Sequence, residues 1–180
     1  MSKSRPAWLQ HLLRIVLLLL LCVVALQVVF AARIALMNVL APQSTTFQRS
    51  EAWRLLTEQH QLLWSQDWVD GSRISNHLRR AVIASEDAGF ADHGGVEWDA
   101  IEKAWAKNQQ AEARAEKAAR PGKGGKLPVP KVVGGSTITQ QLAKTLFLSG
   151  ERTALRKAQE LVLTLMLEAL LPKPRILDIY

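Results

Sequence analysis

The chain has 180 residues, a formal net charge of +7 at pH 7, four histidines and one cysteine. The single cysteine, Cys22, excludes an internal disulfide and a metal site built from several cysteines, and the histidines lack the HxxxH and HExxH spacings of zinc sites. The positive charge indicates an anionic partner, and composition alone leaves nucleic acid, anionic lipid and a phosphate-bearing substrate open.

The N-terminal segment gives the strongest signal in the composition. Residues 15–32 are apolar except for Gln27, and Arg14 and Arg33 flank them. About 20 apolar residues in a helix cross the hydrocarbon core of a bilayer, so residues 1–37 are predicted to form a cytoplasmic tip and a transmembrane anchor. A cleaved signal peptide is the alternative, but the apolar run is longer than a signal peptide requires and no small-residue cleavage site ends it cleanly.

The charges beside this apolar run predict its orientation. Lys3, Arg5 and Arg14 precede it, and no acidic residue appears before Glu51. Because basic residues favour the cytoplasmic side, the N-terminus is expected in the cytoplasm. The chain after Arg33 is expected outside it, in a compartment without an ATP supply.

After the anchor, the pattern predicts a linker followed by helices. Residues 38–50 contain proline and a Ser/Thr cluster and are expected to be the linker. Apolar residues recur at helical spacing over residues 51–64, and Ser72 is expected to cap a helix that carries the apolar positions of residues 74–83. Strand-like alternation is nearly absent, so residues 51–180 are predicted to form a mainly α domain.

The second half of the chain continues this helical pattern with one interruption. Asp99 and Glu102 have capping-box spacing and are expected to open a helix. Residues 109–132 are basic and become rich in glycine and proline, which predicts a flexible, exposed loop. A solvated linker without a role is the alternative for it, although its charge could favour anionic lipid headgroups. Residues 137–148 and 154–171 are predicted to be helical.

Three segments carry polar residues that ordinary packing does not explain, and the first is an acidic pair. Glu86 and Asp87 end an apolar helix and enter a glycine-bearing loop that also contains Phe90 and His93. Apolar surroundings raise the pKa of a carboxyl group, which suits such a group to proton transfer. The alternative is a simple helix end followed by a turn.

The second segment places two glycines before a capped helix. Gly134 and Gly135 would let the backbone approach a ligand, and Thr137 with Gln140 makes a capping box. The free N–H groups of a helix N-terminus bind phosphate well, and Lys144 lies further along the same polar face. An ordinary amphipathic capped helix is the alternative.

The third segment is a polar stripe on an otherwise apolar helix. Arg156, Glu160, Thr164 and Glu168 recur every four residues, and Lys157 lies beside the first of them. Buried carboxylates are costly unless they are paired or solvated in a cleft, and Arg156 can pair with Glu160 at i,i+4. Both a functional cleft and a structural ion pair fit this pattern.

In this order the three segments resemble the peptidoglycan glycosyltransferase family, the lysozyme-like transferase domain of penicillin-binding proteins, and in particular its monofunctional biosynthetic members. The family's first motif, ED-x-x-F-x-x-H-x-G, is matched by Glu86, Asp87, Phe90, His93 and Gly95. The second, G-x-S-T-I-T-Q-Q-x-x-K, is matched by residues 134–144, and the third, R-K-x-x-E, by Arg156, Lys157 and Glu160. A fourth motif is matched only in part, by Lys173, Ile176, Leu177 and Tyr180.

The resemblance implies an enzyme that polymerises lipid II into β-1,4-linked glycan strands with inversion at the anomeric carbon and release of undecaprenyl pyrophosphate. It implies that Glu86 is the catalytic base and that Glu160 is a second functional glutamate at the donor site. The substrate-binding residues that it implies are Asp87, Phe90, His93, Ser136, Thr137, Gln140, Gln141, Lys144, Arg152, Arg156 and Lys157.

The resemblance also implies a location and partners. We expect a single-pass protein of the inner membrane whose catalytic domain is periplasmic, with lipid II and the growing glycan strand as its ligands. Cell-division or elongation proteins are candidate partners, and nucleic acid is not. No metal site and no cofactor are expected, although a divalent cation could stimulate the reaction.

The sequence departs from the family pattern at several points. Glu97 and Pro172 replace the usual Asp and Ser/Thr, and residues 109–132 look longer than the family's segment. The family continues beyond the position of Tyr180, so a C-terminally truncated domain is expected.

Other functions fit parts of the sequence. The main alternative is a truncated, non-catalytic membrane protein that binds lipid II or cell-wall synthesis partners. A lysozyme-like hydrolase is disfavoured by the cationic context of Lys144 and Arg156, and a nucleic-acid binder by the predicted topology.

Overall fold

A computed structural model describes residues 7–62, 65–118, 134–151 and 153–180. These residues form helices and irregular segments, and no strand occurs among them, which agrees with the mainly α class predicted from the sequence. The α-helices are α1 (Ala7–Leu36), α2 (Thr46–Arg54), α3 (Asn76–Glu86), α4 (Trp98–Ala118), α5 (Ile138–Phe147), α6 (Ala154–Leu170) and α7 (Lys173–Ile179). A π-helical turn follows α2 (Leu55–Gln59), and a 3₁₀ turn precedes α3 (Gly71–Arg73).

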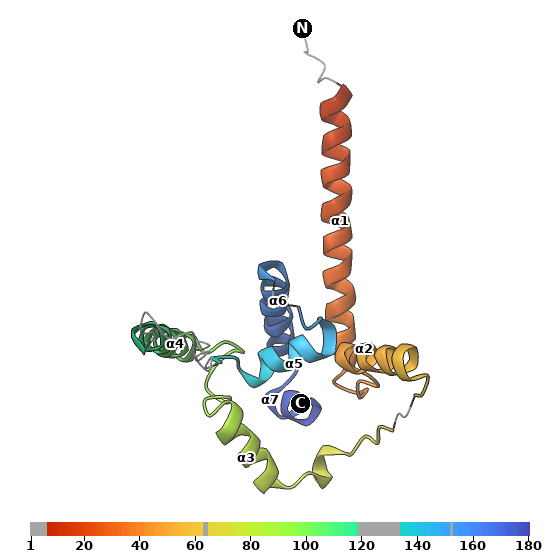
Figure 1. The fold of residues 1–180 in the computed structure, drawn as a ribbon. Coiled ribbons are helices and arrows are strands. Elements are labelled where there is room, and N and C mark those ends of the chain that lie inside the picture. The colour runs from red at the N-terminus through yellow and green to blue at the C-terminus, as the bar shows by residue number, and fades with distance from the viewer. Residues whose placement is uncertain (1–6, 63–64, 119–133, 152) are drawn as a thin grey trace.

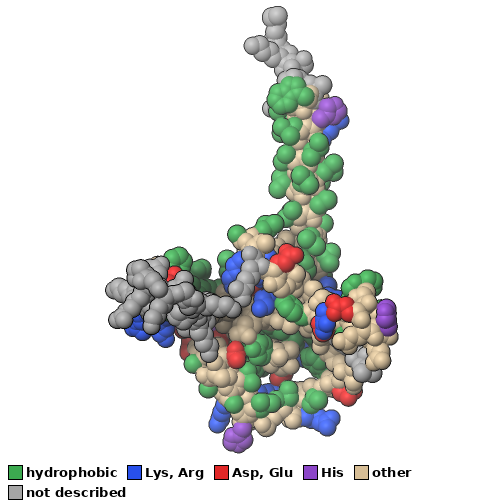
Figure 2. Space-filling view, viewed as in Figure 1, with side chains coloured by type: hydrophobic (Ala, Val, Ile, Leu, Met, Phe, Trp, Pro, Cys, Tyr) green, Lys and Arg blue, Asp and Glu red, His purple; other side chains and the backbone are tan. Residues whose placement is uncertain are grey.

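Helix α1 extends away from the other helices as a long rod (Figure 1). Its residues Trp8–Leu36 are long and apolar enough to cross a membrane, with a mean hydropathy of 3.1 over the most apolar stretch. At 1.5 Å per residue this helix measures about 43 Å, which exceeds a hydrocarbon core of about 30 Å. Hydrophobic side chains cover the rod (Figure 2). The predicted anchor helix is thus present.

The foot of α1 does not end in a free linker. Ile34 and Met37 are buried in the same hydrophobic cluster as residues of α5, α6 and α7. The guanidinium group of Arg175 on α7 donates a hydrogen bond of 2.6 Å to the carbonyl oxygen of Met37. The last turn of α1 is therefore part of the domain core, whereas residues 1–37 were predicted to be only the cytoplasmic tip and the anchor.

Helix α2 starts inside the segment that was expected to be a linker. Thr45 and Gln48 form a capping box, in which the Thr45 hydroxyl accepts the Gln48 N–H and the Gln48 side chain accepts the Thr45 N–H. This reciprocal pair fixes the helix start at Thr46, so the irregular segment is shorter than the predicted residues 38–50. The helix continues through the π-helical turn to His60, whose φ of 52° ends it.

The start of α3 also differs from the prediction. Ser75 rather than Ser72 is the cap, because its hydroxyl oxygen accepts the Leu78 N–H. Asp70 instead accepts the Ser72 N–H and caps the preceding 3₁₀ turn. Arg79 on α3 bonds to Asp178 on α7 at 2.7 Å, and this contact joins the helix that carries Glu86 to the core.

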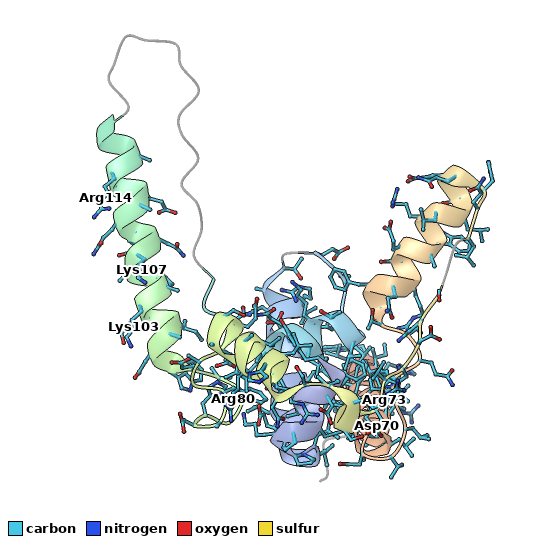
Figure 3. All side chains as sticks on the ribbon, turned by 90° about the horizontal axis from the view of Figure 1, so that it is seen from below. Asp70, Arg73, Arg80, Lys103, Lys107 and Arg114 are labelled. Atoms are coloured by element: carbon cyan, nitrogen blue, oxygen red, sulfur yellow. The ribbon has the colours of Figure 1, made fainter. Side chains whose placement is uncertain are left out.

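Helix α4 begins one residue earlier than Asp99, so Asp99 lies in its first turn rather than at its cap. An acidic residue there still complements the helix dipole. Lys103, Lys107 and Arg114 lie along this helix (Figure 3). Its described part includes the beginning of the predicted loop 109–132, which is therefore helical as far as Ala118; residues 119–133 lie outside the described part of the chain.

The core forms where α5 and α6 pack against each other and α7 and the foot of α1 close them. Ile138, Leu142 and Leu146 of α5 are spaced by four residues and are all buried. Leu163 and Leu167 of α6 are fully buried beside them. Burial of one such side chain contributes about 1.5–3 kcal/mol, so this four-helix junction holds the loops that carry the polar motifs.

Candidate active site

Glu86 is the last residue of α3, and its side chain meets α5. Gln141 Nε2 donates a hydrogen bond of 3.1 Å to Glu86 Oε2, and the Tyr180 hydroxyl donates one of 3.0 Å to Gln141 Oε1. Glu86 is exposed. An exposed carboxylate whose orientation a neighbouring amide fixes can accept a proton from a bound hydroxyl group.

Tyr180 acts as the donor in this chain of hydrogen bonds. Burial raises the pKa of its phenol group, and the negative charge of Glu86 raises that pKa further. The hydroxyl group therefore keeps its proton at neutral pH. Tyr180 was matched to the fourth motif, but no sequence signal connected it with Glu86.

Asp87 is buried and connects the loop after α3 to the start of α5. Its Oδ2 accepts the Ile138 N–H at 3.0 Å, and its Oδ1 lies 2.8 Å from His93 Nε2. His93 Nδ1 accepts the Gly95 N–H at 3.1 Å, so Nε2 carries the proton and donates to Asp87. This carboxylate satisfies a free N–H group of the helix N-terminus, and it holds the neighbouring Glu86 at the end of α3.

Phe90, Thr137 and Gln140 also hold the site together. Phe90 lies in the core with 3 % of its surface exposed, and the Lys173 ammonium group lies 4.4 Å from its ring centre. Thr137 and Gln140 form the predicted capping box of α5, and the Thr137 hydroxyl donates to the Gly95 carbonyl oxygen at 2.7 Å. Direct substrate contacts of these buried residues, and of Asp87 and His93, stay a prediction.

Two adjoining cavities form what we call the active-site cleft. The smaller, of about 90 Å³, is lined by Glu86, Asp87, Glu97, Ala100, Gly134, Gly135, Ser136 and Thr137. The larger, of about 250 Å³, is lined by Ile101, Ala104, Trp105, Asn108, Gly135, Ser136, Gln140 and Lys157. Gly135 and Ser136 border both cavities, so the cleft runs from Glu86 at one end to Lys157 at the other.

Gly135 lets the two walls of this cleft come close together. A Cβ atom on Gly135 would lie 3.1 Å from the carbonyl oxygen of Ala100 and 3.2 Å from the Cα of Ile101. These are backbone atoms of α4, which cannot move aside as a side chain could. Gly135, which stands at the variable second position of the second motif, is therefore required for the approach of α4 to the start of α5.

Next to Lys157, at the far end of the cleft, a buried carboxylate lies between two cations. Glu160 is 3 % exposed; its Oε2 lies 2.6 Å from an Arg156 guanidinium nitrogen, and its Oε1 accepts a hydrogen bond from Lys157. The i,i+4 pair predicted from the sequence is thus confirmed. Lys157 remains about half exposed, so its ammonium group can also meet a ligand in the larger cavity.

Of the predicted cations that the structure describes, only Lys157 is placed among the residues that line this cleft. The Lys144 ammonium group lies over the ring of Phe47, 5.8 Å from its centre, on the side of α5 that faces α2. Lys144 lines neither cavity of the cleft, and neither does Arg156, which is paired with Glu160. Arg152 lies outside the described residues. Their contact with the substrate stays a prediction.

The structure adds cleft residues that sequence reasoning missed. Ile101, Ala104, Trp105 and Asn108 line the larger cavity from one face of α4. Their spacing of i, i+3, i+4 and i+7 is a helical stripe, and this signal was available in the sequence. Glu97, noted before only as a departure from the family pattern, lines the smaller cavity.

Among the described residues, Asp87, His93 and Glu97 place potential metal ligands within 4.8 Å of one another. Both ring nitrogens of His93 already have partners within the protein. A cation bound to His93 would have to displace one of those bonds. Stimulation by a divalent cation stays a prediction.

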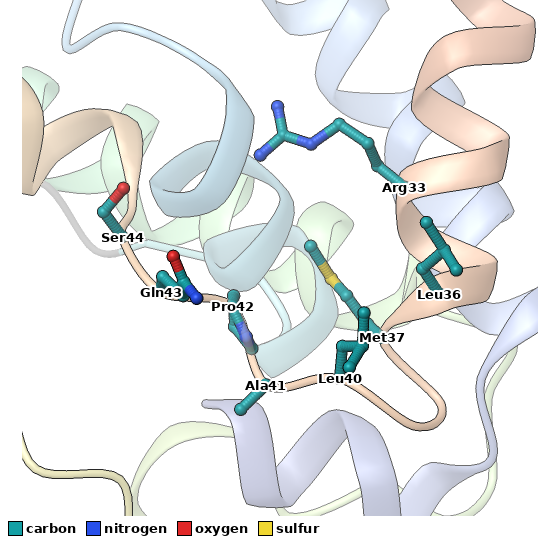
Figure 4. Close-up of a pocket in the computed structure, with 8 residues that line it drawn as sticks. All are labelled: Arg33, Leu36, Met37, Leu40, Ala41, Pro42, Gln43 and Ser44. Carbon is teal, nitrogen blue, oxygen red and sulfur yellow. The ribbon is translucent and has the colours of Figure 1, made fainter.

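A further cavity lies at the foot of α1, away from Glu86. It has a volume of about 300 Å³ and is lined by Arg33, Leu36, Met37, Leu40, Ala41, Pro42, Gln43 and Ser44. The Arg33 side chain extends from α1 toward the side of this cavity where Ser44 lies (Figure 4). Its guanidinium group lies 5.4 Å from the ring centre of Phe147.

Comparison with known proteins places this site in a family context. A protein-family model described as "Transglycosylase" matches residues 54–180. A biosynthetic peptidoglycan transglycosylase of Burkholderia thailandensis is 49% identical over 156 residues, which cover 87% of this chain and 54% of the relative. Proteins with the same name are 42% identical over 177 residues in Paraburkholderia phytofirmans (98% of this chain, 67% of the relative) and 50% identical over 139 residues in Bordetella pertussis (77% and 52%). The chain thus spans about half to two thirds of the length of these relatives.

Proposed function

The chain belongs to the transglycosylase family, and from this membership we propose that it polymerises lipid II into β-1,4-linked glycan strands. The observation that carries the proposal is the active-site cleft, which joins an exposed, oriented carboxylate at Glu86 to a cationic end at Lys157, whose partner Glu160 also binds Arg156. A glycosyl transfer from a diphosphate-linked donor requires these two functions at opposite ends of one cleft.

The proposed reaction uses Glu86 as the base. The Glu86 carboxylate takes the proton of the acceptor's 4-hydroxyl group while that oxygen forms a bond to the anomeric carbon of the donor. The bond between this carbon and the donor's diphosphate oxygen breaks, and undecaprenyl pyrophosphate leaves with the electron pair. Attack from the opposite face inverts the anomeric carbon. The hydrogen bond from Gln141 supports this role because it fixes the direction of the carboxylate.

The departing diphosphate needs positive charge where its own charge develops. Lys157 supplies it at the far end of the cleft, Arg156 adds charge from behind, and Glu160 holds both cations in place. We assign Glu160 the task of orienting this donor end. Lys144 and Arg152 stay proposed ligands of the diphosphate on the strength of the motif resemblance.

The substrate's lipid tail requires a membrane, and the apolar helix α1 fits that need. We propose a single-pass anchor in the inner membrane with a cytoplasmic N-terminus and a periplasmic catalytic domain, supported by the basic residues that precede the span. The growing glycan strand is the second ligand. Contacts with cell-division or elongation proteins stay a prediction.

The test is polymerisation of lipid II by the purified protein, with Glu86→Gln as the variant. Loss of a general base lowers the rate by roughly 10²–10⁴-fold, so we expect glycan polymer from the unaltered chain and almost none from the variant. Glu102→Gln is the matched control, because Glu102 is exposed on α4 and lines neither cavity of the cleft. Normal polymerisation by Glu86→Gln would refute the base assignment. Lipid II binding without polymer from the unaltered chain would favour the non-catalytic alternative.

A further inference from the structure

Gln27, the polar residue within the apolar run of α1, has a specific partner on α6. Gln27 Nε2 donates to Gln159 Oε1 at 3.2 Å, and Gln159 Nε2 donates to Gln27 Oε1 at 3.1 Å. Each amide therefore gives one hydrogen bond to the other and receives one. A primary amide in an apolar surrounding is costly when it lacks partners, and this pairing satisfies both groups at once.

A second contact shows that α1 and α6 run in the same direction with a constant offset. Asn38 Nδ2 donates at 2.9 Å to the carbonyl oxygen of Leu170, in the last turn of α6. Gln27 and Gln159 are 132 residues apart in the chain, and so are Asn38 and Leu170. Since Asn38 lies in the turn that directly follows α1, the two helices run parallel between two contacts about 16 Å apart, and α6 stands beside the lower part of α1 (Figure 1).

This register gives the height of α6 relative to the apolar run. With an offset of 132, residues 154–164 of α6 lie level with residues 22–32 of α1, which belong to the apolar run 15–32. Large apolar side chains on α6 are exposed at this height, among them Leu155 at 83 % and Val162 at 39 %. A bilayer crossed by α1 would reach them.

The amide pair also lies beside the charged end of the cleft. Gln159 precedes Glu160 directly, and Arg156 and Lys157 are on the turn before it. A shift of α6 along α1 would move these charges by the same distance relative to the membrane surface. Such a shift would also break both amide hydrogen bonds.

We propose that the Gln27–Gln159 pair is an intramembrane clasp that sets the height of the catalytic domain. It holds the first turns of α6 at the boundary between hydrocarbon and headgroups of the outer leaflet, where Leu155 and Val162 meet lipid and Lys157 and Glu160 face the diphosphate of a membrane-bound substrate. Gln27 is thus a positioning residue for the reaction, although it lies in the span. This inference rests on the proposed function and on the membrane-spanning role of α1.

The first experiment measures height and is independent of activity. Cys22→Ser first removes the native cysteine. Leu155→Cys or, in a separate variant, His77→Cys then carries a fluorophore. Each labelled protein is placed in proteoliposomes whose lipids bear nitroxide quenchers on their acyl chains. His77 is exposed on α3, remote from the contacts between α1 and α6. We expect strong quenching at position 155 and little at position 77, and at least a two-fold change at 155 when Gln27→Leu is added. Quenching at 155 by aqueous iodide alone would overturn the proposal.

The second experiment separates positioning from a general structural role. Gln27→Leu and Gln159→Leu are each expected to raise KM for lipid II in proteoliposomes about three- to ten-fold, with kcat within two-fold. The double variant should be no worse than either single variant, because both remove the same clasp. In detergent micelles, which have no fixed bilayer height, KM should be unchanged. Val28→Leu and Ala158→Leu, which alter exposed neighbours, are the matched controls.

The outcomes distinguish the clasp from the proposed function. Equal losses in micelles and bilayers, or additive losses in the double variant, would show a merely structural contact and overturn the proposal. An inactive unaltered chain would contradict the proposed function, while the quenching measurement would still decide whether the clasp sets the height of α6.

Discussion

Two adjacent glycines in the loop after α3 have different surroundings. Gly95 has a φ of 89°, and a Cβ atom added there would lie 2.7 Å from Glu168 Cγ and 2.8 Å from Thr164 Cγ2. Gly94 has no atom within 4 Å of an added Cβ. The loop that carries His93 therefore tolerates a side chain at one glycine and not at the other.

Gly95→Ala is expected to lower the free energy of unfolding by about 2–4 kcal/mol, because left-handed strain and a clash with α6 add together. Gly94→Ala should change it by less than about 0.5 kcal/mol. Chemical denaturation of the detergent-solubilised protein measures both. Equal stability of the two variants would contradict the close packing of this loop against α6.

Tyr180 is a second residue whose contribution can be tested alone. Tyr180→Phe removes the hydrogen bond to Gln141 and so frees the amide that orients Glu86. We expect kcat to fall about three- to ten-fold, as for loss of one hydrogen bond of about 1 kcal/mol, with KM nearly unchanged. Since its raised pKa keeps the phenol protonated, the ratio of the two rates should be constant from pH 6 to 9.

The control for Tyr180→Phe is the same substitution in a protein that lacks the Gln141 side-chain amide. In a Gln141→Ala background, Tyr180→Phe should have no further effect on kcat, because the path to Glu86 is already broken. A full additional loss in that background would mean that Tyr180 acts by another route.

Among the helices, α1 has two different environments along its length. Most of its side chains are exposed and apolar, as a lipid-facing helix requires, but Ile34 is fully buried by the domain. Leu36, two residues later, is 54 % exposed. The last turn therefore has one side that belongs to the protein core.

Ile34→Ala should lower the free energy of unfolding by about 2–5 kcal/mol, the usual range for a buried isoleucine that leaves a cavity. Leu36→Ala is the matched control on the same turn and should change it by less than about 0.5 kcal/mol. Denaturant titration of both variants in one detergent checks the difference. Similar losses would mean that the helix foot does not insert into the core.

The helices show which features the sequence could predict. The start of α5 was predicted correctly because Thr137 and Gln140 are three residues apart and their capping box is a local interaction. The Arg156–Glu160 pair was predictable for the same reason. The capping box of Thr45 and Gln48 was equally local, and the Ser/Thr cluster around it was instead interpreted as a linker.

Other features could not be predicted because they join distant parts of the chain. The N–H group that Asp87 binds belongs to Ile138, 51 residues away, and no local sequence pattern around Asp87 predicts this contact. Ile34 and Met37 have the composition of membrane residues, so the sequence cannot distinguish lipid contact from core contact there. The cleft likewise needs the approach of α4 to Gly135.

For the whole molecule, the anchor and the domain are one structural unit. Ile34 and Met37 lie in the cluster, and Arg175 and Asn38 add hydrogen bonds between the two parts. A chain that starts at residue 38 is therefore expected to be aggregation-prone, whereas one that starts at residue 30 should stay monomeric with a cooperative unfolding transition. Size-exclusion chromatography and thermal melting of the two shortened chains make the comparison. Equal behaviour would show that the domain core is complete without α1.

The burial of Ile34 also has a consequence for how the protein is made. Apart from Phe90, the other buried members of the cluster that contains Ile34 and Met37 come from residues 138–179, near the other end of the described chain. During synthesis the foot of α1 is made long before those partners. Its apolar side chains therefore stay exposed until more than a hundred further residues have been added. Such long-range contacts slow folding and leave aggregation-prone intermediates exposed. The bilayer surface, or a chaperone beside the translocation channel, would have to shelter this turn until the last helices arrive.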